Sequence, residues 1–131
     1  MNIKLLTSPK AEKKYRVVFE SGKVVDFGRK GYSDYTIHKT PSRMRSYVAR
    51  HAGNVPKSLM SERDPKKIQN RMLRVTTSTR EKWGKNGIET AGFWSRWLTW
   101  SFPTLKEAIK YIEKTYNVKV NGTSRNVSMP L

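Results

Sequence analysis

The sequence feature that most constrains the fold is the aromatic stretch from Thr90 to Thr104. It holds three of the four tryptophans, Trp94, Trp97 and Trp100, in a chain that is otherwise poor in large apolar side chains. Each aromatic side chain that becomes buried removes on the order of 150 to 250 Å² from water, so a few of them supply the central mass of a small core. We interpret the stretch as core, and a base-stacking or ligand platform is the alternative.

The spacing of the three tryptophans indicates that they meet different neighbours. Side chains three residues apart on a helix drift by about 60° per step, so the three indoles do not share one narrow stripe. We expect Trp97 to meet a helix near the end of the chain and Trp94 to meet a β-hairpin near its beginning. Trp100 is expected nearer a rim or a partner, less buried than Trp97.

The length of the chain, 131 residues, fits one domain. We predict the α+β class: a small single domain in which a β-hairpin packs on about three helices around the Trp-rich core. The predicted domain spans 15–117. An N-terminal arm at 1–14, in which Ile3, Leu5 and Leu6 suggest a short strand or arm, precedes it, and a C-terminal arm at 118–131, where 118–120 add a short edge strand, follows it.

The hairpin is predicted over 15–27, where two β-branched and aromatic runs flank Glu20-Ser21-Gly22. A three-residue loop with Gly22 in the left-handed conformation would pair Tyr15 with Phe27. The same register places Arg16 opposite Asp26 and gathers the apolar side chains on one face. We therefore predict this register rather than that of a two-residue Ser-Gly loop.

Capping signals predict three helices. Thr40 and Pro41 open the first, which is expected over about 41–52 with Gly53 as its stop. Asp64 and Pro65 open the second. Thr104 begins the third with capping-box spacing, and its apolar face continues to Asn117.

The charge is the strongest global property. The chain has 27 Lys and Arg against 10 Asp and Glu, a formal net charge of +17. Such an excess favours an anionic partner: nucleic acid, an anionic membrane surface or an acidic protein face. The excess is concentrated in 29–85, where the acids are only Asp34, Glu62, Asp64 and Glu81.

The basic middle of the chain yields the candidate binding residues. As a nucleic-acid site it would place seven side chains against phosphates without base specificity, with Tyr32, Tyr35 or Tyr47 interleaved. A solvated or protein-bound basic face is the alternative. The seven candidates for contact with phosphate or another anionic partner are Arg43, Arg45, Arg50, Lys66, Lys67, Arg71 and Arg74.

Catalytic and cofactor chemistry has little support in the sequence. The chain has no cysteine, and His38 and His51 do not have the spacing of a metal motif. The carboxylates are scattered, whereas a metal-dependent nuclease needs them clustered. No phosphate-binding glycine-rich motif and no nucleophile elbow is present. We therefore expect a non-enzymatic protein without a metal, a cofactor or a small-molecule substrate. No signal peptide or apolar transmembrane run is recognised.

Two segments carry a resemblance to a known family. They are Asp34-Tyr35-Thr36-x-His38 with the basic residues that follow it, and Thr90-Ala-Gly-Phe-Trp-Ser-Arg-Trp-Leu-Thr-Trp with the closing helix. Together they resemble a family of small basic, Trp-rich proteins of large double-stranded DNA viruses, of the chlorovirus and mimivirus type. The resemblance covers roughly 15–117. It brings no functional residues with it, so no site is carried over.

The resemblance implies a virion structural role. The first hypothesis is a minor capsid protein of the kind found in chloroviruses. Such a protein would lie on the inner face of the shell and bridge capsomers or contact the internal membrane. Its expected partners are the major capsid protein and further minor proteins. The alternative is a virion-associated, sequence-nonspecific DNA-binding protein. Both imply a location in the virion, and in the host cytoplasm or viral factory during assembly.

Overall fold

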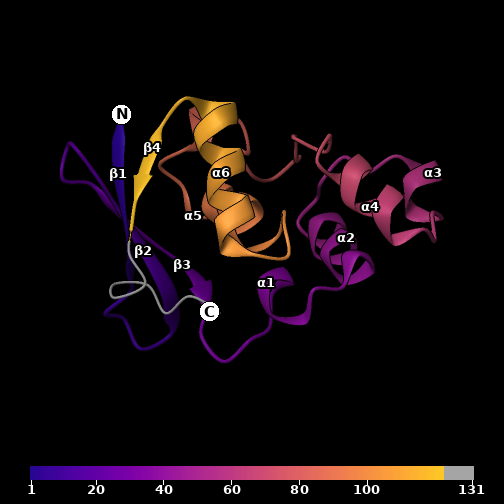
Figure 1. Cartoon of the computed structure of the whole chain (residues 1–131), viewed down its shortest axis with the longest axis horizontal. Helices are drawn as coiled ribbons and strands as arrows, with labels where there is room; N and C mark the ends of the chain where they lie inside the picture. Colours follow the sequence, from indigo (N-terminus) through magenta and orange to yellow (C-terminus); the bar gives the residue numbers. More distant parts are fainter. Residues whose placement is uncertain (123–131) are drawn as a thin grey trace.

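The structure is a computed structural model and describes residues 1–122. A four-stranded sheet forms one end of the molecule, α2 and α4 form the other, and α5 and α6 lie between them (Figure 1). The predicted α+β class is confirmed. The elements are β1 (Asn2–Thr7), β2 (Lys13–Phe19), β3 (Val24–Arg29), α1 (Tyr35–His38), α2 (Pro41–Arg50), α3 (Lys57–Met60), α4 (Pro65–Met72), η1 (Lys85–Gly87), α5 (Ala91–Trp94), η2 (Ser95–Thr99), α6 (Leu105–Tyr116) and β4 (Lys119–Asn121).

The sheet has the strand order β3-β2-β1-β4. The predicted hairpin register is confirmed, because Tyr15 lies opposite Phe27 and Arg16 opposite Asp26. Gly22 has φ of 91°, as the three-residue loop requires. The predicted edge strand near the C-terminus is β4, which pairs in parallel with β1.

Residues 1–14, expected as a short strand or an arm beside the domain, belong to the sheet. Residues 2–7 form β1, which lies in the interior of the sheet between β2 and β4, and residue 13 already begins β2. Ile3 and Leu5 are fully buried. Ile3 and Leu5 alternate with polar side chains, as in a strand with one buried face. This pattern is too short to predict that the strand has a neighbouring strand on each side. Of the expected C-terminal arm, 119–121 form β4, and 123–131 lie outside the described residues.

One face of the sheet carries the apolar side chains and is covered by the aromatic stretch and α6. Trp94 lies against Phe27 of the hairpin, with ring centroids 6.1 Å apart. Trp97 lies against Tyr111 of α6 at 5.3 Å. Both indoles are fully buried, whereas Trp100 is only partly buried. The expected neighbours of Trp94 and Trp97 and the lower burial of Trp100 are thus confirmed.

The aromatic stretch is not one regular helix. It begins as α5, capped by Thr90, and continues from Ser95 to Thr99 as the π-helix η2. Arg96 lies in this turn and is fully buried. Its guanidinium donates to the carbonyl oxygens of Trp100 (2.6 Å), Met72 (2.6 Å) and Val75 (3.1 Å). It also lies 4.3 Å from the ring centroid of Trp97. A charged side chain therefore joins the aromatic stretch to the end of α4.

The helix boundaries follow the capping signals closely. Thr104 accepts from the Glu107 amide at 3.2 Å, and Asp64 accepts from the Lys66 amide at 3.0 Å. Thr40 is the N-cap residue of α2 by geometry, but its side chain makes no capping bond. The helix ends at Arg50, before the expected stop, and Ala52 rather than Gly53 has positive φ, 62°. Gly53 is needed instead for close packing, because a Cβ there would lie 2.5 Å from Val48.

Candidate functional site

A cleft of about 640 Å³ lies between the β2–β3 end of the sheet, α2 and η2. We call it the basic cleft. The neighbouring strands β2 and β3 and one face of α2 supply its basic side chains. These five cations are Lys13, Lys14, Arg29, Arg43 and Arg50.

Strand register brings the first cations together. Lys13 of β2 lies directly opposite Arg29 of β3, and both line the basic cleft. Like charges in a directly opposite cross-strand pair repel and destabilise a sheet. Within residues 1–122, neither side chain has an ion pair with a carboxylate. An anion bound in the basic cleft would relieve this repulsion.

Helical periodicity brings the other two guanidiniums together. Arg43 and Arg50 are seven residues apart on α2, which is close to two full turns, so both point to the same side of the helix. Tyr47 lies between them on the same stripe, and all three line the basic cleft. The two arginines are exposed and about 10 Å apart along the helix axis, so each can meet a different anionic group.

The basic cleft contains little negative charge. Asp34 is the only carboxylate in its lining among the described residues. It accepts from Lys14 Nζ at 2.6 Å and from the Thr36 amide at 2.8 Å, and it caps α1. Since Asp34 is committed to these contacts, Lys13 and the three arginines retain their charge for a ligand.

Aromatic side chains form one wall of the basic cleft. Trp100 and Tyr47 stack with ring centroids 4.2 Å apart and planes 4° apart, and His51 stacks on the other side of Tyr47 at 4.0 Å. His51 Nδ1 lies 2.8 Å from Glu81 Oε2, which fixes the orientation of the imidazole. Burial raises the pKa of Tyr47, so its phenol stays neutral.

Tyr32 stands apart from this stack on the loop after β3. Its side chain is 58% exposed although it also lines the basic cleft. The guanidinium carbon of Arg29 lies 4.5 Å from its ring centroid, a cation–π contact. The phenol ring is therefore backed on one face by a cation.

The structure places only two of the seven predicted anion contacts, Arg43 and Arg50, in the basic cleft. Arg45 has a structural role, since its Nη1 donates to the carbonyl oxygens of Leu59 (2.8 Å) and Glu62 (2.7 Å). Arg71 lies 3.6 Å from a Glu62 carboxylate oxygen. Lys67 and Arg74 are exposed on and after α4, away from the basic cleft.

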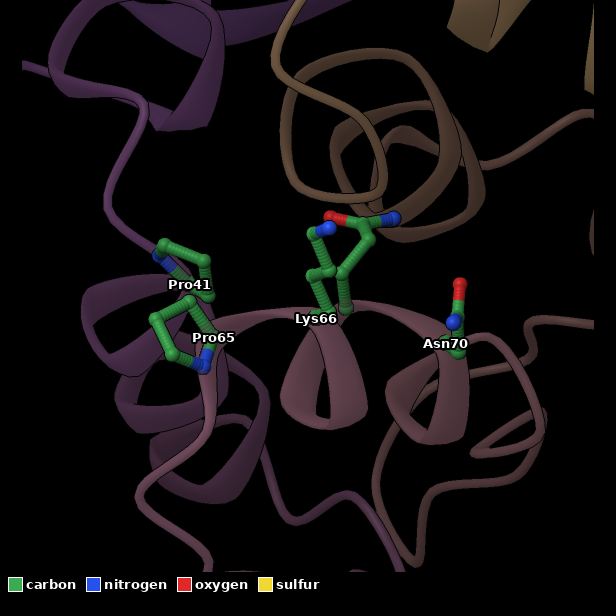
Figure 2. Close-up of a pocket in the computed structure, with 5 residues that line it drawn as sticks. Pro41, Pro65, Lys66 and Asn70 are labelled. Carbon is green, nitrogen blue, oxygen red and sulfur yellow. The ribbon is translucent and has the colours of Figure 1, made fainter.

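The remaining predicted contact, Lys66, lines a separate and shallower depression of about 380 Å³. Figure 2 shows it between the first residues of α2 and α4, where Pro41 and Pro65 lie side by side and Lys66 extends beside them. Gln69 in the same lining donates to the Ser101 carbonyl at 2.9 Å and accepts from the Tyr35 hydroxyl. With a single cation and an amide already engaged, this depression is a weaker candidate.

Sequence reasoning missed Lys13, Lys14 and Arg29 as members of one site. The signal was present, because the hairpin register that pairs Tyr15 with Phe27 also pairs residue 13 with residue 29. Of the three tyrosines expected among the cations, Tyr32 and Tyr47 line the basic cleft. Tyr35 is buried instead. Trp100 joins the site from the far end of the sequence, a proximity that no local pattern indicates.

No group of three or more His, Asp or Glu that could hold a metal ion occurs within residues 1–122. In the same part of the chain, no helix is both long and apolar enough to cross a bilayer.

Comparison with known proteins gives one partial match. A family of unknown function (DUF5754) matches residues 3–51, from β1 to the end of α2. The matched segment holds all five cations of the basic cleft as well as Tyr32 and Tyr47. No curated protein and no solved structure matches the chain.

Proposed function

We propose that the protein binds nucleic acid through its sugar-phosphate backbone in the basic cleft, without reading base sequence. The observation that carries the proposal is the concentration of five cations in one concave site. Its only carboxylate among residues 1–122 is paired with Lys14, which leaves four cations without a carboxylate partner. Phosphate contacts from Lys and Arg supply most of the affinity of sequence-independent binding. The net charge of +17 adds long-range attraction for the same class of ligand.

The arrangement of the cations fits a chain of phosphates better than a single anion. Lys13 and Arg29 lie on the strand side of the basic cleft, and Arg43 and Arg50 lie on the α2 side. A nucleic acid, which has a negative charge on every nucleotide, can contact the strand side and the α2 side of the basic cleft at once. Guanidinium groups suit this role because they bind phosphate oxygens in a bidentate manner and remain charged at all relevant pH.

The proposed role is binding rather than catalysis. Hydrolysis of phosphodiesters by metal-dependent nucleases needs clustered carboxylates that hold the metal against the phosphate. Among residues 1–122, the basic cleft offers Asp34 alone, and its oxygens are occupied by Lys14 and by the start of α1. A cleavage assay on single- and double-stranded DNA with Mg²⁺ or Mn²⁺ should therefore show no turnover above a purified blank.

The test is the salt dependence of binding to a fluorescently labelled oligonucleotide, measured by anisotropy. Log affinity should fall linearly with log salt, with a slope of about −0.7 to −0.9 per phosphate contacted. Replacing Arg43 and Arg50 together by Glu should weaken binding by about tenfold or more and reduce the slope by about 1.5 to 2.

The matched control replaces Lys67 and Arg74 by Glu. This pair makes the same change in net charge on exposed side chains outside the basic cleft. It should retain most of the affinity and nearly all of the slope. Equal losses in the two double variants would show a diffuse electrostatic attraction instead of a site, and absence of binding by the wild type at low salt would end the proposal.

The role as a minor capsid protein in the virion rests on the resemblance alone and stays a prediction. Its partners, capsomers or an internal membrane, would also be anionic surfaces. Cross-linking in intact particles tests it, because links to the major capsid protein favour that role and links to DNA favour the role proposed above.

A further inference from the structure

We infer that the ligand of the basic cleft is a single strand of nucleic acid, held with one base stacked on Tyr32. This inference rests on the proposed function and narrows it to a ligand class. The phosphate contacts explain attraction to any nucleic acid. The size of the basic cleft and the exposure of its aromatic side chains favour a single strand over a duplex.

The size of the basic cleft excludes a duplex from its interior. Its volume of about 640 Å³ lies within the range of small-ligand sites. Such sites, roughly 300 to 1,000 Å³, enclose drug-sized molecules, comparable to one or two nucleotides. A base-paired double helix is far wider and could only lie across the rim. A single strand, in contrast, can place successive phosphates and a base inside.

Most aromatic faces in the basic cleft are already covered. Tyr47 is sandwiched between Trp100 and His51, at centroid distances of 4.2 and 4.0 Å, so neither of its faces is free. Phe27 is fully buried. Tyr47 and Phe27 therefore offer no open face for a base, whereas Trp100 and His51 are partly exposed.

Tyr32 is the most exposed of the aromatic side chains that line the basic cleft, and local structure holds it in place. Its amide donates to the Arg29 carbonyl at 3.2 Å, which closes a tight turn through Gly31. Gly31 has φ of 86°, a conformation that favours glycine, so the turn depends on this residue. The Arg29 guanidinium lies over the ring at 4.5 Å, yet the side chain remains 58% exposed. The covered face is thus supported by a cation, and the remaining surface is open to a ligand.

An exposed ring beside a row of cations is the combination that single-strand binding requires. Stacking on an aromatic side chain tolerates any base, since every base has a π-face, and it accompanies backbone contacts in a basic groove. A base on Tyr32 would place its phosphates next to Arg29 and Lys13, which line the same cleft. A duplex cannot make this contact, because its bases are stacked on one another.

The experiment compares an oligothymidylate of about eight nucleotides, an abasic oligomer of the same length and a duplex of the same charge. An oligouridylate of equal length serves as the RNA counterpart, and the tighter of the two homopolymers identifies the preferred nucleic acid. Affinities are measured by anisotropy at one fixed salt concentration for the wild type, Tyr32→Ala, Tyr32→Phe and Ile37→Ala. Ile37 is a matched control, since it is 57% exposed and does not line the basic cleft.

The wild type should bind at least one homopolymer more tightly than the abasic oligomer and the duplex. Tyr32→Ala should lower that affinity by about 5- to 150-fold, the effect of losing one stacked base. It should leave affinity for the abasic oligomer unchanged. Tyr32→Phe should retain stacking, and Ile37→Ala should bind like the wild type.

Two results would overturn the inference. One is equal affinity for the homopolymers and the abasic oligomer, and the other is an equal loss for all ligands in Tyr32→Ala. In both cases the proposed function would still hold if binding depends on salt and is lost when Arg43 and Arg50 are replaced by Glu. Failure of the wild type to bind any of the oligomers would refute both.

Discussion

The buried Arg96 gives the sharpest test of how the aromatic stretch is held. We consider Arg96→Met, which has a similar length and no charge. Buried ion pairs can often be replaced by apolar side chains without loss, because both charges leave together. Here the partners are backbone carbonyls of Met72, Val75 and Trp100, which remain after the substitution.

The magnitude follows from two opposing effects. Burial lowers the pKa of Arg96 to about 10 from 12.5, so removing the charge relieves about 3 kcal/mol of unfavourable desolvation. The Met72 carbonyl keeps the Val75 amide as a donor, at 3.0 Å, but the carbonyls of Val75 and Trp100 lose theirs. Each of these two costs about 1–3 kcal/mol, or about 4 kcal/mol together. Loss of the cation–π contact with Trp97, 4.3 Å away, adds about 1–2 kcal/mol. The net expectation is a destabilisation of about 2–3 kcal/mol.

The assay is urea unfolding at neutral pH, followed by tryptophan fluorescence and by far-UV circular dichroism. Coincident transitions establish that one free energy of unfolding describes the change. Arg63→Met is the control, since Arg63 is exposed and its substitution should change stability by less than about 0.5 kcal/mol. If Arg96→Met is as stable as the wild type or more stable, the carbonyls do not depend on the guanidinium and the reasoning is refuted.

Two further predictions concern stability. The Arg16 guanidinium is the main cause that lowers the pKa of Asp26 to about 2. Because the folded pKa lies below the unfolded value of 3.8, this stabilisation, about 1–2 kcal/mol, is present above about pH 4 and is lost as the pH falls through 2. Urea midpoints at about pH 5 and about pH 2.5 should differ less in Asp26→Asn than in the wild type, and equal differences would contradict the assignment. Thr104→Ala should lower the free energy of unfolding, measured by heat or urea, by about 1 kcal/mol because it removes the α6 cap. Thr40→Ala has no capping bond to lose and should lower it by less than about 0.5 kcal/mol. A larger loss in Thr40→Ala than in Thr104→Ala would contradict these cap assignments.

Local signals predicted those parts of the fold that depend on neighbours in sequence. The hairpin register followed from cross-strand chemistry, and α6 followed from its capping box and apolar stripe. The insertion of β1 between β2 and β4 could not be predicted in this way. Its parallel partner lies at the other end of the described chain, and a three-residue strand carries almost no pattern of its own.

The candidate site was predicted in part for the same reason. Arg43 and Arg50 were identified because helical periodicity is readable from sequence. Arg45 has the same chemistry but lies on another face of α2, where its guanidinium binds carbonyls of the α3 segment. Assigning a role to each arginine required knowing which segment packs against each face, and that information is tertiary.

The parallel pairing of β1 with β4 also bears on how the chain folds during synthesis. Asn2 pairs with Lys119, so the ribosome must make nearly the whole described chain before this contact can form. Until then, the nascent sheet ends at β1 with an unpaired edge, and unpaired edges recruit other strands. Lys4 is exposed on that strand, and a charge at such a position discourages pairing with another copy. Completion of the sheet is therefore a late, long-range step, and a nascent chain released before residue 119 would expose an edge open to aggregation.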